Sequence, residues 1–302
     1  MEQARRSVSR LAVHQPQGGP GRAESDLHLR ADADPLHQGA ERIRQEAITL
    51  VAAGQSFAQG ATNFTPDWVE RSNGIAYKLL EAGAQFAPEF AGQTGVDGYD
   101  EEIFDLRENL FERMQAVNRQ NIAMLEELLS SEEDHRVRQD IEIMIKSERD
   151  EMEADRINYE KVLPYGNING IVFFGFKGLL DKQVPFERQK AALVRLKKYT
   201  GQADGYDVFT DLAKERLSER FDVPGLIKPF AGEVQQDLER SPVMIEGLKG
   251  LFEATELEGW EQDLALLSGQ LTDYNRWVEE TILPNTRESA VLPRELYELQ
   301  LK

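Results

Sequence analysis

The sequence predicts an all-α fold, an irregular bundle of long antiparallel helices. Two stripes of apolar residues recur at steps of three and four positions, as a helix with one buried face requires. The first stripe runs from Ile103 to Leu128 and the second from Leu264 to Ile282. Nowhere do β-branched and aromatic residues alternate over four or more positions between turn signals, so no strand is predicted.

Helix-start signals locate the first three helices. The segment Thr65-Pro66-Asp67 offers a capping hydroxyl, a proline for the first helical position and an acid for the first turn, which predicts a helix through about Phe90. Asp100 is expected to cap the helix that carries the first stripe. The run Ser130-Ser131-Glu132-Glu133-Asp134 is expected to cap the next one. Two long antiparallel helices would result.

The second half of the chain predicts shorter helices. The apolar run 171–176 is far below the roughly 20 residues that cross a bilayer, so a buried helix is expected. Its glycines Gly175 and Gly178 would allow close helix packing. Further helices are predicted over 185–199, over 208–217 and over the second stripe, ending near Pro284. Pro224, Pro229 and Pro242 are expected in first turns or at kinks.

Charge and composition exclude several classes of protein. The 302 residues contain 35 Lys and Arg against 54 Asp and Glu, a formal net charge of −19. This charge opposes nucleic acids and anionic membranes, so neither is expected as a partner. The chain has no cysteine, which excludes disulfides, thiol nucleophiles, thiolate zinc sites and iron–sulfur clusters. Hydrophobic residues make up 40%, which favours a soluble globular protein.

Residues 1–40 are predicted to form a disordered amino-terminal arm in front of a helical domain, 41–302. The arm is rich in glycine and proline and has no aromatic residue, since the first aromatic residue of the chain is Phe57. It has no apolar run of signal-peptide length, which favours a cytoplasmic location. Three histidines, His14, His28 and His37, would suit a metal-binding arm, but their irregular spacing favours a plain tail.

No catalytic, cofactor-binding or metal-binding residue is predicted. The glycine-rich phosphate loops are absent, and Ser56 lacks the glycine that must follow a nucleophile elbow. Glu132 and His135 are spaced to share a helix face, as in di-iron bundles. Such a site needs two Glu/His pairs, and His135 is the only histidine after the arm. His135 is therefore interpreted as a surface residue beside a helix cap.

Two further clusters have a structural and a functional interpretation. The basic residues of 185–199 would suit an acidic partner, but in so acidic a chain a solvated face paired with neighbouring acids is favoured. They are Arg188, Lys190, Arg195, Lys197 and Lys198. Phe173, Phe174 and Phe176 are typical of a core.

Several landmarks, in order along the chain, carry a resemblance. The first group comprises Gln85-Phe86-Ala87-Pro88-Glu89-Phe90-Ala91, Gly95-Val96-Asp97-Gly98-Tyr99-Asp100 and Asp105-Leu106. The second comprises Leu163-Pro164-Tyr165, Gly178-Leu179-Leu180 and Arg188-x-x-Ala191-Ala192-Leu193-x-Arg195-Leu196-x-x-Tyr199. The third comprises Trp277-Val278-x-x-x-Ile282-Leu283-Pro284 and Leu292-Pro293-Arg294-Glu295-Leu296-Tyr297. Over about 75–302 the chain resembles the bacterial family named domain of unknown function 885, with Arg294 where that family has a second proline.

The resemblance implies a peptidase-like protein. Members of the family are longer, and their second half carries a His-Glu-x-x-Pro-Gly-His motif similar to that of helical zinc peptidases. No such motif occurs here, so the chain is expected to be a catalytically incomplete amino-terminal half that forms a substrate-channel wall. Zinc is implied only for intact relatives, and the implied partners are a missing carboxy-terminal half or a peptide substrate.

Two functions therefore stay open at the level of sequence. The first is this incomplete peptidase-like half, inactive alone. It would leave a terminal apolar stripe without a packing partner, formed by Leu292, Leu296, Leu299 and Leu301 together with Tyr297. The alternative is a self-sufficient acidic helical module that binds a protein partner.

Overall fold

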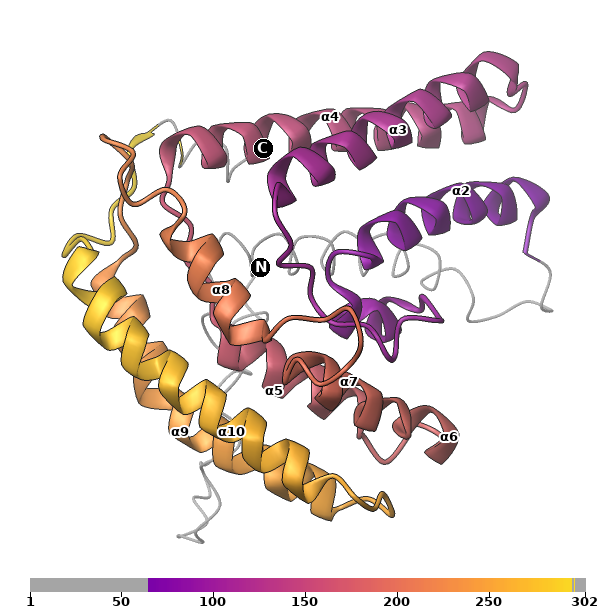
Figure 1. Ribbon diagram of the computed structural model, residues 1–302. Coiled ribbons are helices and arrows are strands. Elements are labelled where there is room, and N and C mark those ends of the chain that lie inside the picture. Colours follow the sequence, from indigo (N-terminus) through magenta and orange to yellow (C-terminus); the bar gives the residue numbers. More distant parts are fainter. Residues whose placement is uncertain (1–64, 295, 297–302) are drawn as a thin grey trace, which may run out of the picture. The chain divides into compact units, whose positions relative to one another are not determined.

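The structure, a computed structural model, describes residues 65–294 and 296 except for the side chain of Gln93. All of the described residues belong to one structural unit. They form helices joined by loops, with two isolated bridges, Val162–Ile227 and Phe230–Arg287, and no strand among them (Figure 1). The all-α prediction is confirmed. The predicted arm 1–40, with its three histidines, and Ser56 lie outside the described residues.

The helices follow one another along the chain, and the longest connections between them are 95–109 and 219–230. They are α2 (Asp67–Ala84), η1 (Pro88–Thr94), α3 (Leu110–Ser131), α4 (His135–Lys161), α5 (Ile168–Leu179), α6 (Phe186–Gln189), α7 (Ala191–Tyr199), α8 (Phe209–Ser218), α9 (Ala231–Glu253), α10 (Glu261–Trp277), η2 (Val278–Ile282) and η3 (Leu283–Asn285). Of these, η1 and η3 are 3₁₀-helices and η2 is a single π-helical stretch that continues α10.

Helices α2, α3 and α4 pack around one apolar cluster. Figure 1 shows α3 and α4 side by side, with α2 along them. Leu125 of α3 and Val137 and Ile141 of α4 are completely buried between them. The connection between α3 and α4 has only three residues, so the two helices are antiparallel, as predicted.

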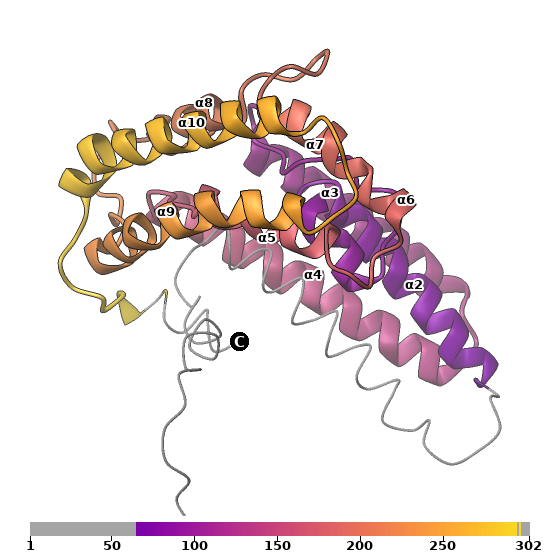
Figure 2. The same ribbon diagram turned by 90° about the horizontal axis from the view of Figure 1, so that it is seen from below.

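A second and larger core lies between helix α5 and the four helices α7, α8, α9 and α10. Seen from below, α9 and α10 run side by side and α5 lies against α9 (Figure 2). Phe176 of α5, Leu196 of α7 and Phe252 of α9 are completely buried in this core. The buried helix predicted for 171–176 is thus confirmed. Pro242 lies in the interior of α9, and Pro224 and Pro229 lie in the connection before that helix, so none of the three prolines is in a first turn.

The first predicted helix is wrong at both ends. Thr65 does not cap it, because α2 begins at Asp67 with Pro66 as the cap residue and no side-chain cap bond. The helix ends at Ala84, before the expected Phe90. Pro88 explains the early end, since a proline disfavours helical backbone angles in the residue before it. The backbone of Ala87 accordingly leaves the helical region and η1 starts at Pro88.

Asp100 does not cap a helix, contrary to the prediction. Residues 100–109 are not helical, and α3 begins only at Leu110, after Asn109 in the left-handed region with φ 56°. The Asp100 carboxylate instead accepts two hydrogen bonds from Arg188, at 2.7 and 2.9 Å. Ile103 and Leu106 fit the helical spacing by coincidence, because their segment is held by contacts from distant parts of the chain.

The predicted cap of the next helix is also displaced. Ser130 and Ser131 are the last residues of α3, and each hydroxyl donates to a carbonyl of its own helix. The cap of α4 is Asp134, whose carboxylate accepts from the Arg136 amide at 3.0 Å. An ionised acid at this place satisfies an amide and also suits the positive end of the helix dipole.

Gly175 permits a close approach between α5 and η1. A Cβ atom at this position would lie 2.6 Å from Cγ of Glu89, closer than non-bonded carbon atoms can approach. We expect Gly175→Ala to destabilise the protein by about 1–3 kcal/mol, since the core must shift to admit the methyl group.

Urea unfolding followed by circular dichroism measures this effect, with Gly269→Ala as the matched control. Gly269 is an exposed glycine within α10 and has open space around it. Alanine there should be neutral or stabilising by up to about 1 kcal/mol. Equal effects of the two substitutions would contradict the close approach at Gly175.

Candidate functional site

A buried polar node lies where η1, α5 and α7 meet, and we define it by Glu89, Arg195 and Tyr199. Glu89 is 5% exposed, Arg195 2% and Tyr199 0%. The Tyr199 hydroxyl donates to Oε1 of Glu89 at 2.5 Å, and the Phe104 amide donates to the same oxygen at 2.7 Å. The carboxylate of η1 thereby fixes both α7 and the segment 99–106.

Arg195 holds the backbone of that segment. Its guanidinium donates to the carbonyls of Tyr99 at 3.1 Å, Glu102 at 3.0 Å and Gly175 at 3.2 Å. Planar guanidinium donors diverge in fixed directions, so one side chain can satisfy several carbonyls at once. The loop that contains Tyr99 and Glu102 and the helix α5 are therefore both held by this single side chain.

The predicted solvated basic face is thus wrong for part of 185–199. Arg195 is buried, and the Lys198 side chain is only 9% exposed, with its ammonium 2.8 Å from Glu102. Arg188 and Lys190 do follow the prediction, because they are partly exposed and pair with Asp100 and Glu187.

Burial controls the electrostatics of the node. It raises the pKa of Glu89 above its ordinary value, although the charge of Arg195 and the hydrogen bond from Tyr199 oppose this. Burial and the Glu89 carboxylate also raise the pKa of Tyr199 well above its ordinary value, so the hydroxyl stays a donor. Since neither group reaches solvent, the node positions backbone and cannot touch a substrate in this conformation.

The node and its surroundings bring separate sequence landmarks into contact. Glu89 of the first group binds Tyr199 of the second across 110 residues of chain. Asp100 binds Arg188 across 88 residues, and the Tyr99 carbonyl accepts from Arg195 across 96. Residues that the resemblance singles out one by one are therefore physical partners of one another.

A second cluster is accessible to solvent, and we call it the acidic pair. Glu233 and Asp237 lie one turn apart on the same face of α9, and both are half-buried. Asp237 accepts from the Asn167 amide nitrogen at 2.8 Å and from the Tyr165 hydroxyl at 3.2 Å. Both donors precede α5, so the pair joins the start of α9 to the start of α5.

The acidic pair titrates near neutrality. Burial and the neighbouring Asp237 raise the pKa of Glu233 to about 7, against the opposing charge of Arg287. Burial raises the pKa of Asp237 to about 6, although the hydrogen bonds from Tyr165 and Asn167 favour its ionised form. The pair can therefore take up or release a proton within the physiological range, which no sequence motif indicated.

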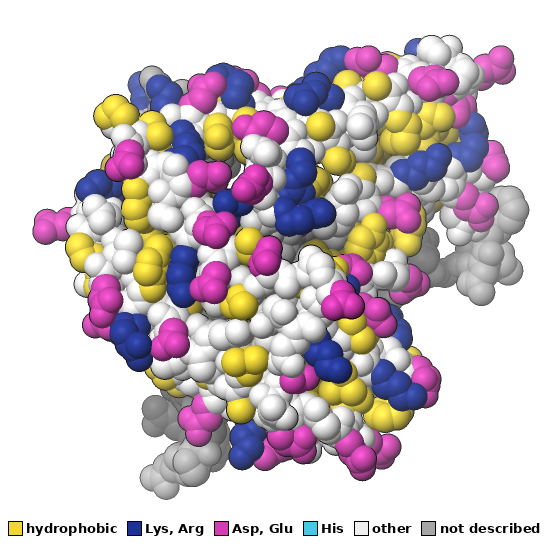
Figure 3. Space-filling view, in the orientation of Figure 1, with side chains coloured by type: hydrophobic (Ala, Val, Ile, Leu, Met, Phe, Trp, Pro, Cys, Tyr) yellow, Lys and Arg dark blue, Asp and Glu magenta, His cyan; other side chains and the backbone are white. Residues whose placement is uncertain are grey.

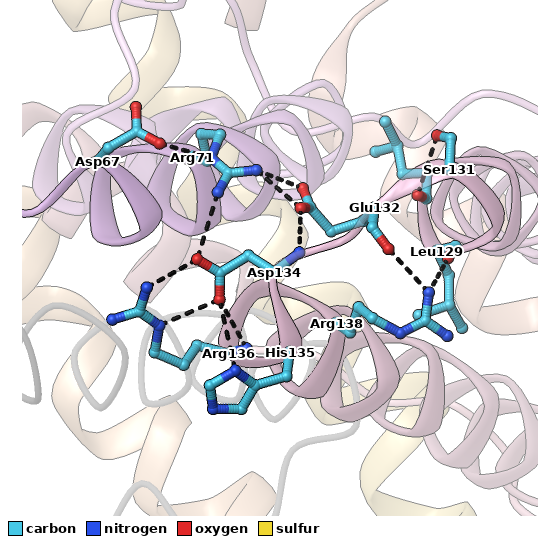
Figure 4. Close-up of polar contacts among 10 residues, drawn as sticks. Asp67, Arg71, Leu129, Ser131, Glu132, Asp134, His135, Arg136 and Arg138 are labelled. Carbon is cyan, nitrogen blue, oxygen red and sulfur yellow. Dashed lines mark hydrogen bonds and ion pairs between the residues drawn. The ribbon is translucent and has the colours of Figure 1, made fainter.

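Glu132 and His135 do not form a ligand pair. Figure 4 shows that Glu132 faces Arg71 of α2, whose Nη1 donates to both carboxylate oxygens at 2.8 and 2.6 Å. The His135 side chain is 88% exposed, and its Nδ1 lies 3.9 Å from Asp134. As predicted, His135 is a surface residue beside a helix cap. The Arg71 contacts tie α2 to the turn between α3 and α4.

A zinc site like the one that the family resemblance implies does not fit the residues that the structure describes. Within 65–294 and at 296, no three His, Cys, Asp or Glu side chains are grouped so that they could hold a metal ion. His135 is the single histidine in this part of the chain and points to solvent. A catalytic zinc site normally draws three ligands from His, Asp, Glu or Cys, so no step is assigned to zinc here.

The surface carries both signs of charge despite the net value of −19. Figure 3 shows acidic and basic side chains interspersed over one face, with no single acidic field. Many are paired, as for Arg156 with Glu153 and Glu160. In the described part of the chain, no helix is both long and apolar enough to span a membrane.

Comparison of the chain with models of protein families, with curated proteins and with solved structures gives no match. The likeness to the family named domain of unknown function 885 therefore rests on the landmark residues alone.

Proposed function

We propose that this chain is a helical, non-catalytic part of a peptidase-like protein and forms one wall of a peptide-binding channel. The proposal follows from the resemblance over residues 75–302, which implies a helical half without the metal-binding motif. The observation that supports it best is the contact between landmarks, above all Glu89 with Tyr199 at 2.5 Å. If the landmark residues define a common fold, they are expected to contact one another in the structure.

The node suits a wall that must keep its shape. Arg195 fixes three carbonyls at distances of 3.0–3.2 Å, and Glu89 fixes an amide of the same segment. A binding surface gains affinity when its backbone is held in place before the ligand arrives. In this proposal the landmark residues hold the backbone of the channel wall in place, and the residues that cleave the peptide belong to a carboxy-terminal half.

The test is metal analysis and activity of the full chain, followed by complementation. We expect less than about 0.1 zinc per chain after dialysis and no cleavage of unstructured peptides, because the described residues offer no imidazole set. Adding the separately produced carboxy-terminal half of a family member, with its His-Glu-x-x-Pro-Gly-His motif, should give a one-to-one complex that cleaves peptides. That half alone is the control.

Two results would contradict the proposal. One tightly held zinc per chain with peptidase activity would make the chain itself catalytic. A folded chain that forms no complex with carboxy-terminal halves would instead favour the second candidate.

The second candidate is a self-sufficient helical module that binds a protein partner, and one observation favours it. Leu296 belongs to the apolar stripe expected to lack a packing partner, yet it is only 4% exposed. That expectation is therefore wrong for Leu296, while Leu299 and Leu301 lie outside the described residues. A sharp, cooperative unfolding transition of the chain alone, without binding of a hydrophobic dye, would support this candidate.

A further inference from the structure

A groove of about 330 Å³ runs along the seam between α3 and α4, far in the sequence from the node and the acidic pair. Gln115, Arg119 and Ile122 line it from α3, and Arg149, Met152, Glu153 and Arg156 line it from α4. Ile122 and Met152 are half-buried and form an apolar floor. The charged lining residues are the three arginines and Glu153, which pairs with Arg156.

The three arginines differ in how their charge is used. Arg149 pairs with Glu126 at 2.5 Å, and Arg156 pairs with Glu153 at 2.8 Å and Glu160 at 2.7 Å. Arg119 is exposed and has no ion-pair or hydrogen-bond partner among the residues that the structure describes. The groove therefore offers one uncompensated guanidinium beside an apolar floor.

Gln115 adds a directional polar group. Its amide nitrogen donates to the Met152 carbonyl at 3.2 Å, which orients the side chain across the seam. No hydrogen bond from the described residues reaches its carbonyl oxygen, which can accept from a peptide N–H. An apolar floor, one free guanidinium and one amide carbonyl match a short peptide end better than a long acidic segment.

We propose that this groove binds the carboxyl-terminal residue of a peptide whose last side chain is apolar. The terminal carboxylate pairs with Arg119, since a guanidinium offers two parallel donors to a carboxylate. The last side chain lies on Ile122 and Met152, and Gln115 accepts the peptide N–H. The single terminal carboxylate matches the one arginine of the lining that has no acidic partner among the described residues, and the volume suits one or two residues. The proposal does not depend on the peptidase-like assignment.

The test compares two forms of one probe, N-acetyl-Ala-Ala-Leu as the free acid and as the carboxyl-terminal amide, by calorimetric titration of the full chain. We expect the acid to bind at least about tenfold more tightly than the amide, because only the acid can form the charged pair. Raising the salt concentration should weaken binding of the free acid more than binding of the amide.

Arg119→Gln is the matched variant and Arg276→Gln its control, since Arg276 is a 64% exposed arginine of α10. Arg119→Gln should lower the affinity for the acid at least about tenfold and leave that for the amide unchanged. Arg276→Gln should change neither, and circular dichroism should show both variants folded. Equal binding of acid and amide, equal binding by the two variants, or no binding at millimolar probe would overturn the proposal. Two other outcomes would also overturn the proposal. In the first, a peptide amide with an internal glutamate binds as tightly as the free acid, so that any carboxylate suffices. In the second, the protein forms a dimer that Arg119→Gln dissociates, so that the occupant of the groove is a second copy of the chain.

Discussion

Replacing Arg195 by methionine is expected to destabilise the protein by about 3–5 kcal/mol, the largest effect of any single substitution considered for this chain. The change removes three hydrogen bonds to backbone carbonyls, at 3.0–3.2 Å, from a side chain that is 2% exposed. It also removes the cation that offsets the buried Glu89 carboxylate. Buried groups that lose their partners keep the full cost of their desolvation.

Urea unfolding followed by circular dichroism measures this loss, and Lys197→Met is the matched control. Lys197 belongs to the same helix and is exposed, so its replacement should change stability by less than about 0.5 kcal/mol. Arg195→Lys should fall between the two, since an ammonium keeps the charge but cannot span three carbonyls. A loss below about 1 kcal/mol in Arg195→Met would show that the node does not support the fold.

The stability of the protein is expected to fall as the pH rises from about 4.5 to about 7.5. The pKa of Glu233 is raised to about 7 and that of Asp237 to about 6, so the folded state binds more protons than the unfolded state in this range. A raised pKa stabilises the fold at low pH, and this contribution is lost as the pH rises through the raised value. The growing negative charge acts in the same direction.

Below this range the sign reverses. Burial acts to raise the pKa of Asp105, but hydrogen bonds from Arg107 and Arg113 outweigh it and lower the pKa to about 2. The stability that Asp105 contributes is therefore present above its ordinary pKa and is lost as the pH falls towards 2. Together the two effects place the maximum of stability at about pH 4.5.

The midpoints of urea unfolding at pH values from about 4.5 to about 7.5 measure this dependence. The test variant is the double substitution Glu233→Gln/Asp237→Asn. The wild-type chain should lose about 2 kcal/mol between pH 4.5 and 7.5, a value reduced from the full shifts because both groups are half-exposed. The double variant should lose less, and Glu239→Gln, an exposed acid of the same helix, should behave as wild type. An unchanged slope in the double variant would exclude the acidic pair as its cause.

The spacing of apolar residues correctly predicted those helices that bury one face against the rest of the protein. In α10, Leu264, Leu267, Leu271 and Tyr274 recur at helical steps, and all four are buried. The prediction failed where a segment is held by distant side chains. Ile103 and Leu106 have helical spacing, but their backbone is fixed by Glu89 and Arg195, which no local pattern encodes.

A signal for the node was nevertheless present in the sequence. Ala192, Arg195, Leu196 and Tyr199 occupy positions i, i+3, i+4 and i+7, so Arg195 lies on the apolar stripe of its helix. Charge alone suggested a solvated residue, whereas position suggested a buried one. The acidic pair had a weaker signal, because many acids of the chain are four residues apart and only the fold brings Tyr165 and Asn167 to Asp237.

The connection between Glu89 and Tyr199 also has a kinetic consequence. It closes a loop of 110 residues that contains the whole α3–α4 hairpin, and loops of this length form slowly compared with neighbouring helices. The hairpin should therefore assemble early from local contacts, and the closure of the loop should limit the folding rate. The Phe104 amide, which donates to Glu89, would report each reopening of that loop through its rate of hydrogen exchange with solvent.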